Sequence, residues 1–269
     1  MADEIHPTDA MHKIGAACCD PLWIQHRTLA GGHDKTIDNA TATFIKFRDH
    51  NFICTCAHVV EAAKGDLVPA LMVGQLVLNV ASYHVDNVYR HNFRFPDRTE
   101  FDIAIAPLDA SYWNLLQTKK AKTAIDLDAW EEPEWLTTDT FVAVGYFNEH
   151  KYNHEGKVAT PLGLVAAEAA SSMGAELPKF ALSSRLNTPH GYYFSGMSGG
   201  PIFLPVSADK MLPVGIVFEG GPSSGRHKAR STLIDPTDIL IRAYTLTPLI
   251  FEDWLSRTGL LPPTQHAPT

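Results

Sequence analysis

Short apolar runs, separated by glycine, proline, asparagine and aspartate, fill most of the chain from residue 20 to residue 246. The runs 44–47 and 52–55 flank a polar turn at 49–51, which is the pattern of two strands joined by a hairpin. Further strands are predicted at 103–106, 141–146, 201–204 and 213–218. Many short strands with frequent turn signals predict an all-β fold class.

Helical patterns are found at two places. Residues 59–64 predict a short helix soon after the run 52–55. Near the C-terminus, Thr247 suits an N-cap, Pro248 suits a first helical turn and Gly259 suits a helix end. One apolar face between them consists of Ile250, Phe251, Trp254 and Leu255. This segment is therefore predicted to form a C-terminal helix.

Composition limits the class of partner. The chain has 269 residues, of which 45% are hydrophobic and 19% are charged, as in ordinary globular proteins. A formal net charge of −8 argues against nucleic acid as a partner. Residues 1–7 carry acids and no apolar run, so no signal peptide is expected. The most apolar stretch, 67–80, is short and interrupted by polar residues, so we expect strands and a turn there and no membrane partner.

The four cysteines favour a reducing compartment. Cys18 and Cys19 are adjacent, and Cys54 and Cys56 lie two apart on a predicted strand, where they would share a face. Neither spacing is a usual disulfide or zinc pattern. Buried free thiols are the favoured interpretation, which predicts a cytoplasmic protein.

Three short segments carry residue types with catalytic chemistry: Thr55–His58, Phe101–Ala104 and Gly196–Pro201. Each alone has an ordinary structural explanation, as a packed or surface histidine, a strand opened by an acid, and a turn. Together they supply the three groups that nucleophilic catalysis by serine requires.

A serine hydroxyl needs a neighbouring base, and a histidine needs a carboxylate to fix its tautomer and orientation. Ser198, His58 and Asp102 are the candidates for nucleophile, base and carboxylate. The glycines beside Ser198 allow a tight turn in which backbone N–H groups can stabilise an oxyanion.

In this order, and with these flanking residues, the segments resemble the active site of the trypsin-like serine peptidase family, over roughly residues 40–255. The resemblance implies a chymotrypsin-like fold of two antiparallel six-stranded β-barrels with a C-terminal α-helix. It places His58 and Asp102 on the first barrel and Ser198 on the second, and it implies an oxyanion hole formed by the N–H groups of Gly196 and Ser198. The chain resembles stand-alone, disulfide-free trypsin-like peptidase domains of bacteria more than it resembles digestive or clotting enzymes.

The resemblance also divides the chain into parts. We expect an N-terminal arm or irregular strand at 1–20, a first barrel at 21–125, a connection at 126–140, a second barrel at 141–246, the helix at 247–259 and a disordered tail at 260–269.

Two departures from the family bear on activation and specificity. Met197 stands where secreted members have an aspartate that receives a new N-terminus, so activation by N-terminal cleavage is not expected. Tyr192 stands where enzymes that prefer Lys or Arg have an acid, and Phe218 replaces a small residue, which favours a small or apolar P1 residue. The candidate substrate-binding residues are His190, Tyr192, Val217, Phe218, Glu219 and Gly220. For Glu219, a solvated strand end is the alternative.

Other polar groups have two interpretations each. The basic segment 223–230 would attract an acidic substrate or partner, or is a soluble surface loop. His150 and His154 lie four apart, and His84 and His91 lie in predicted loops, but no helical pattern supports a metal site. We therefore expect solvated histidines and no metal.

The leading hypothesis is a serine endopeptidase that cleaves a protein or peptide substrate through an acyl-enzyme and needs no cofactor. Lacking a zymogen switch, it would have narrow specificity or an activating protein partner. Two alternatives stay open: a catalytically silent protein-binding module on the same fold, and an esterase-like hydrolase.

Overall fold

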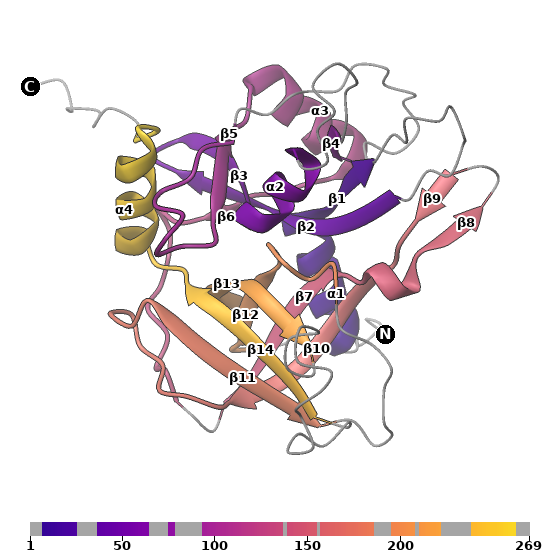
Figure 1. Cartoon of the computed structure of the whole chain (residues 1–269). Coiled ribbons are helices and arrows are strands. Elements are labelled where there is room, and N and C mark those ends of the chain that lie inside the picture. Colours follow the sequence, from indigo (N-terminus) through magenta and orange to yellow (C-terminus); the bar gives the residue numbers. More distant parts are fainter. Residues whose placement is uncertain are drawn as a thin grey trace, which may run out of the picture.

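The computed structural model describes residues 7–25, 37–64, 75–78, 93–136, 139–154, 157–185, 195–207, 210–221 and 238–261. Two β-structures lie one above the other, the upper built from the first half of the chain and the lower from the second half (Figure 1). Strands dominate, so the all-β prediction is confirmed.

The first half forms a six-stranded sheet. Its order is β4-β1-β2-β3-β5, with β6 beside β2. The bounds are β1 Cys19–Gln25, β2 Ile37–Phe47, β3 His50–Thr55, β4 Gln75–Leu78, β5 Ala104–Pro107 and β6 Ile125–Asp126. Two features differ from the predicted antiparallel barrel: within the described residues the sheet is open, and β6 runs parallel to β2. The parallel pair arises because the chain after β5 passes through a helix before it returns to β2.

The second half forms a closed six-stranded barrel in the order β10-β11-β14-β13-β12-β7, and every neighbouring pair is antiparallel. The bounds are β7 Thr140–Tyr146, β10 Leu162–Ala169, β11 Lys179–Arg185, β12 Pro201–Pro205, β13 Met211–Gly221 and β14 Asp238–Thr245. Alternate residues of these strands, such as Phe141, Ala143, Ile241 and Ala243, fill one buried cluster. The predicted second barrel is confirmed. A small hairpin of β8 Tyr152–His154 and β9 Lys157–Ala159 follows the 3₁₀ turn η1 Asn148–His150.

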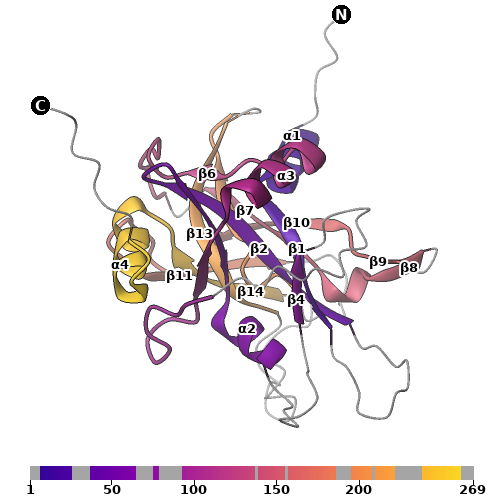
Figure 2. The same cartoon turned by 90° about the horizontal axis from the view of Figure 1, so that it is seen from above.

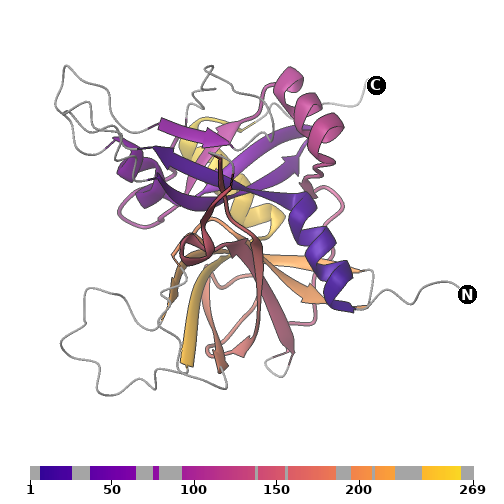
Figure 3. The same ribbon diagram turned by 90° about the vertical axis from the view of Figure 1, so that its right-hand side faces the viewer.

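Four helices accompany the strands in the described part of the chain: α1 Pro7–Cys18, α2 Ala57–Lys64, α3 Ala110–Lys120 and α4 Pro248–Thr258. Helix α1 corrects the expected arm or irregular strand. Met11, Ile14 and Cys18 form a narrow apolar face that packs on the core, and this stripe is easily missed among polar residues. Figure 3 shows α1 running beside both β-structures.

Helix α3 was not predicted, although Asp109 caps it by accepting hydrogen bonds from Ser111 N and Tyr112 N. Helix α4 follows the prediction. Thr247 Oγ1 accepts from Ile250 N at 3.2 Å, and Gly259 ends the helix with a φ of +68°. None of the helices in the described ranges has the length and apolarity needed to cross a membrane.

Helix α4 packs against both β-structures on one flank of the molecule, away from α1 and α3 (Figure 2). Phe251 of α4 contacts Phe47 and Phe52 of the first sheet, with ring centroids 5.8 and 5.7 Å apart. Trp254 of α4 contacts Tyr244 of the barrel at 6.0 Å. This shared core fixes the relative position of the two halves, which carry different parts of the candidate site.

Candidate active site

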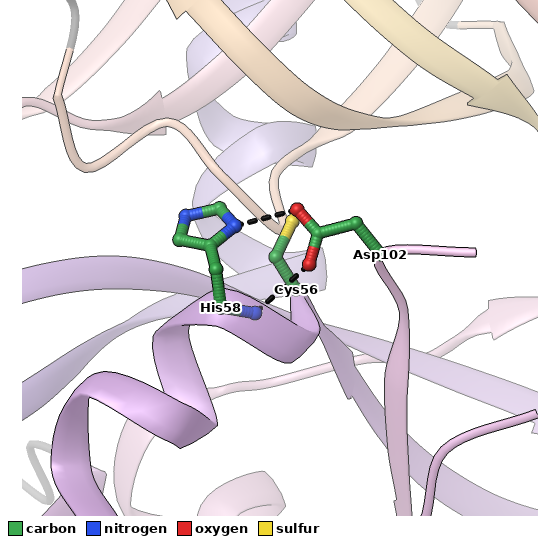
Figure 4. Close-up of side chains that lie close together, drawn as sticks. All are labelled: Cys56, His58 and Asp102. Carbon is green, nitrogen blue, oxygen red and sulfur yellow. Dashed lines mark hydrogen bonds and ion pairs between the residues drawn. The ribbon is translucent and has the colours of Figure 1, made fainter. Parts of the chain in front are cut away.

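His58 and Asp102 are joined by two hydrogen bonds at the start of α2 (Figure 4). Asp102 lies just before β5. One of its carboxylate oxygens accepts the His58 backbone N–H at 2.8 Å, and the other lies 2.6 Å from His58 Nδ1. The first N–H groups of a helix have no partner within the helix, so a carboxylate placed there is bound by backbone as well as ring. Since an ionised carboxylate only accepts, Nδ1 carries the proton and Nε2 is left as the base.

The surroundings of Asp102 favour its charged form. Partial burial alone would raise the pKa of this carboxyl group. The hydrogen bond and charge of His58, together with the backbone N–H groups of His58 and Ala57, outweigh burial and lower the pKa. Asp102 is therefore ionised at neutral pH, as a partner that orients an imidazole must be.

Ser198 lies in the tight turn before β12, and the backbone of this turn requires glycine. Gly196 has a φ of +95° and Gly199 has a φ of +88°. A Cβ atom at Gly196 would lie 2.3 Å from Tyr146 O, and one at Gly199 would lie 2.2 Å from Thr41 O. Larger residues at either position would be strained and would clash.

Two buried threonines of β2 hold the turn, and the sequence analysis missed both. Thr41 Oγ1 donates to Gly196 O at 2.7 Å, and Thr43 Oγ1 donates to Gly199 O at 2.7 Å. The backbone N–H of Thr41 donates to Ser198 O at 3.0 Å. The available signal was the alternation of the polar residues Asn39, Thr41 and Thr43 with apolar residues in the segment 39–44. These bonds cross from the first sheet to the nucleophile turn of the second barrel.

The orientation of two peptide groups bears on the predicted oxyanion hole. The carbonyl of Ser195 accepts from Asn148 N at 2.7 Å, and the carbonyl of Met197 accepts from Gly200 N at 2.8 Å. In a trans peptide the N–H points opposite to the carbonyl, so the N–H groups of Gly196 and Ser198 point away from these internal contacts. Among the described residues, neither N–H has a hydrogen-bond acceptor.

The Ser198 hydroxyl is directed to the edge of β13. Its Oγ donates to the carbonyl of Phe218 at 3.4 Å, and within the described chain it makes no hydrogen bond to the His58 ring. The predicted His58–Asp102 pair is formed, and Cys56 has ligand atoms within 4.8 Å of those of the pair and a side-chain hydrogen bond with Ser198, but no serine–histidine hydrogen bond is found among the described residues.

Cys56 lies close to the His58–Asp102 pair, and its side chain does not share a face of the sheet with that of Cys54, contrary to the prediction. Strand β3 ends at Thr55, so the alternation breaks, and the two thiols lie in different core clusters. All four cysteines are free and buried. The Cys56 thiol donates to Val217 O at 3.3 Å, and its burial, with a smaller effect from the Asp102 charge, raises its pKa.

Cys56, His58 and Asp102 are also the one group of possible metal ligands found among the described residues, with ligand atoms within 4.8 Å of one another. Metal ligation requires a thiolate and a free ring nitrogen. Burial raises the pKa of the Cys56 thiol, which disfavours the thiolate, and both Asp102 carboxylate oxygens already accept hydrogen bonds from His58, so the arrangement fits a hydrogen-bonded pair better than a three-ligand metal site.

The predicted substrate-binding residues of β13 differ in exposure to solvent. Val217 is a correction: it is fully buried, its N–H donates to Gly200 O and its carbonyl accepts from Gly199 N, so it anchors the turn. Phe218 and Gly220 are partly exposed. The Glu219 carboxylate accepts from Arg242 of β14 at 2.8 Å, so it is neither a lone solvated acid nor a free acceptor.

Several predictions fall outside the described residues. They are His190, Tyr192, the whole basic segment 223–230, and residues 262–269 of the expected tail, among others. His150 lies in η1, where its ring contacts Phe147 at 5.4 Å.

No protein-family model and no curated protein matches this chain. Among solved structures, the thermostable serine protease AL20 from an extremophilic microorganism is 14% identical over 91% of this chain and 99% of its own, with a TM-score of 0.46. The protease Anisep from Arthrobacter nicotinovorans is 11% identical over 89% of this chain and 95% of its own, with a TM-score of 0.43. At such low identity, the function of this chain has to be inferred from its own residues.

Proposed function

We propose that this chain is a serine endopeptidase whose catalytic residues are Ser198, His58 and Asp102. The observation that carries the proposal is the ionised Asp102 carboxylate bound through both oxygens to His58, with no hydrogen-bond partner for Nε2 among the described residues, which leaves it to act as a base. No structural role of a half-exposed histidine requires this arrangement, whereas proton transfer from a serine does.

In the proposed mechanism, Ser198 Oγ attacks the carbonyl carbon of the scissile bond while His58 Nε2 takes the hydroxyl proton. Asp102 stabilises the resulting imidazolium. The N–H groups of Gly196 and Ser198, which have no internal acceptor among the described residues, stabilise the oxyanion. His58 then gives this proton to the leaving amine as the peptide bond breaks. In the second half of the reaction, His58 takes a proton from a water molecule that attacks the acyl carbon, and it returns the proton to Ser198 Oγ as the ester bond breaks.

Substrate binding completes the triad in this proposal. A substrate strand beside β13 would donate its P1 N–H to the carbonyl of Phe218, which in the free protein accepts from Ser198 Oγ. The displaced hydroxyl would then turn to His58. Long or absent contacts between nucleophile and base are common before substrate binds.

Met197 supports competence without N-terminal cleavage. Its side chain is fully buried in the core of the second barrel, and a Cβ atom at Gly145 would lie 3.0 Å from Met197 Cα, so only glycine fits comfortably there. Apolar burial therefore orders the nucleophile turn, in place of an ion pair to a new N-terminus. Control would come from narrow specificity or from an activating protein partner, and a cytoplasmic location stays a prediction.

The first test is labelling of purified protein with a fluorescent fluorophosphonate, which reacts only with a competent nucleophile and oxyanion hole. We expect labelling of the wild type and none of Ser198→Ala. Absence of labelling in a folded wild type would favour the silent binding module. Labelling with turnover of small esters, but of no peptide in a diverse library, would favour the esterase-like hydrolase.

A further inference from the structure

Tyr244 of β14 makes a hydrogen bond across the boundary between the two β-structures. Its hydroxyl oxygen accepts the backbone N–H of Asp102 at 2.7 Å. Asp102 precedes β5, which begins at Ala104, so this N–H lies outside the strand ladder and Tyr244 supplies its acceptor. Tyr244 itself is only 2% exposed, so the bond is shielded from competing water.

The Tyr244 ring is fixed by contacts on several sides. Its centroid lies 4.5 Å from that of Phe218, 6.0 Å from that of Trp254 and 5.8 Å from that of Phe101. The Lys179 ammonium lies 5.1 Å from the ring centroid. A ring held in this way leaves its hydroxyl little freedom, so the position of the Asp102 backbone is determined by the second barrel.

One side chain therefore contacts both ends of the candidate triad. The hydroxyl binds Asp102, whose carboxylate orients His58, and the ring packs on Phe218, whose carbonyl accepts from Ser198.

We propose that Tyr244 is a positioning residue of the catalytic triad, a role that rests on the proposed serine peptidase activity. Its hydroxyl sets the distance between Asp102 and His58, and its ring sets the place of the Phe218 carbonyl. Tyr244 does not touch the reacting atoms, so its effect passes through Asp102 and Phe218.

The test is Tyr244→Phe, which removes the hydroxyl and keeps the ring. We expect kcat to fall by roughly tenfold to a hundredfold with KM nearly unchanged, as displacement of a positioned group by a fraction of an ångström produces. Because His58 Nδ1 and Asp102 Oδ2 lie only 2.6 Å apart, we expect the proton between them to give an NMR signal far downfield of the amides. In the variant, this signal should move upfield or be lost to exchange.

The matched control is Tyr112→Phe, a change at a tyrosine of α3 that is also 2% exposed but lies in another core cluster. It should leave kcat and the downfield signal as in the wild type. A folded Tyr244→Phe protein with wild-type kcat and a wild-type signal would overturn the proposal, and so would an equal loss in Tyr112→Phe.

A second variant covers the case in which Tyr244→Phe does not fold. Ring-fluorinated tyrosine at position 244 keeps the shape and weakens the hydroxyl oxygen as an acceptor, so the downfield signal should still shift. An unshifted signal would refute the role of Tyr244. Because the signal is recorded without substrate, failure of the wild type to react with fluorophosphonate would reject the peptidase activity separately.

Discussion

The two halves of the candidate site are held in place by different kinds of interaction. The His58–Asp102 half lies near solvent, with side-chain exposures of 51% and 31%, and depends on a charge and on hydrogen bonds to the first turn of a helix. The Ser198 half is held by backbone carbonyls bonded to buried Thr41 and Thr43, by the buried Met197 side chain and by two glycines in the left-handed region. The first half depends on ionisation, and the second depends on packing and neutral hydrogen bonds.

This difference has a consequence for how each half fails. An ion pair or charged hydrogen bond near solvent weakens as pH falls and its carboxylate becomes protonated, while the backbone around it stays in place. A turn tied by buried hydrogen bonds is insensitive to pH but is damaged when one partner is removed, because the other is left buried and unpaired. The hydrogen bonds from β2 and from Tyr244 are the points at which the two halves meet.

The largest effect tests whether the halves act as one unit. Ser198→Ala and His58→Ala should each lower kcat by roughly 10⁶-fold, and the double variant should lose little more, because members of such a triad are strongly non-additive. The measurement is kcat on the best peptide or p-nitrophenyl ester substrate. Additive losses would mean that the two residues contribute separately.

Asp102→Asn breaks only the first half. The amide keeps the shape of the carboxylate but can stabilise the wrong histidine tautomer, so we expect kcat to fall by about 10⁴-fold. The variant should fold, and its nucleophile turn should be intact in a crystal structure. A loss below tenfold would show that Asp102 is not the partner that orients His58.

The candidate catalytic residues of both halves could be predicted from the sequence better than the contacts that hold them in place. His58, Asp102 and Ser198 stand in local motifs, and α4 carries its own cap and stop at Thr247 and Gly259, so each could be predicted from neighbouring residues. The strand patterns predicted an all-β fold, and the family resemblance implied the second barrel, which the structure shows to be closed.

The supporting contacts depend on tertiary structure and could not be predicted in this way. Thr43 and Gly199 are 156 residues apart, and Asp102 and Tyr244 are 142 apart, so no local pattern relates them. Val217 was assigned to substrate binding, but the irregularity in pairing between Val217 and Glu219 changes which residues face the interior. The parallel strand β6 depends on α3, a helix of weak amphipathicity that sequence periodicity did not indicate.

Thr43→Val breaks the second half with a nearly isosteric change. It removes the donor to Gly199 O, and we expect the free energy of unfolding to fall by about 1–3 kcal/mol. The displaced turn should lower kcat by roughly tenfold to a hundredfold. Thr258→Val is the matched control, since Thr258 Oγ1 is also buried and donates to a carbonyl, that of Leu255 in α4. Equal loss of activity in the two variants would argue against a special role for the β2 threonines.

The smallest effect separates the two halves by pH. The pKa of Asp102 is lowered in the folded protein, so ionised Asp102 contributes stability above its unfolded-state pKa, and this contribution disappears as pH falls through the lower folded-state pKa. In urea titrations, the difference in unfolding free energy between wild type and Asp102→Asn should therefore shrink only as pH falls below the ordinary aspartate pKa near 4, whereas above that range Asp102 contributes no change with pH. The difference between wild type and Thr43→Val should stay constant over the same range, because no ionisable group takes part in that bond. If both differences changed with pH alike, the division of the site into an ionisable half and a packed half would be wrong.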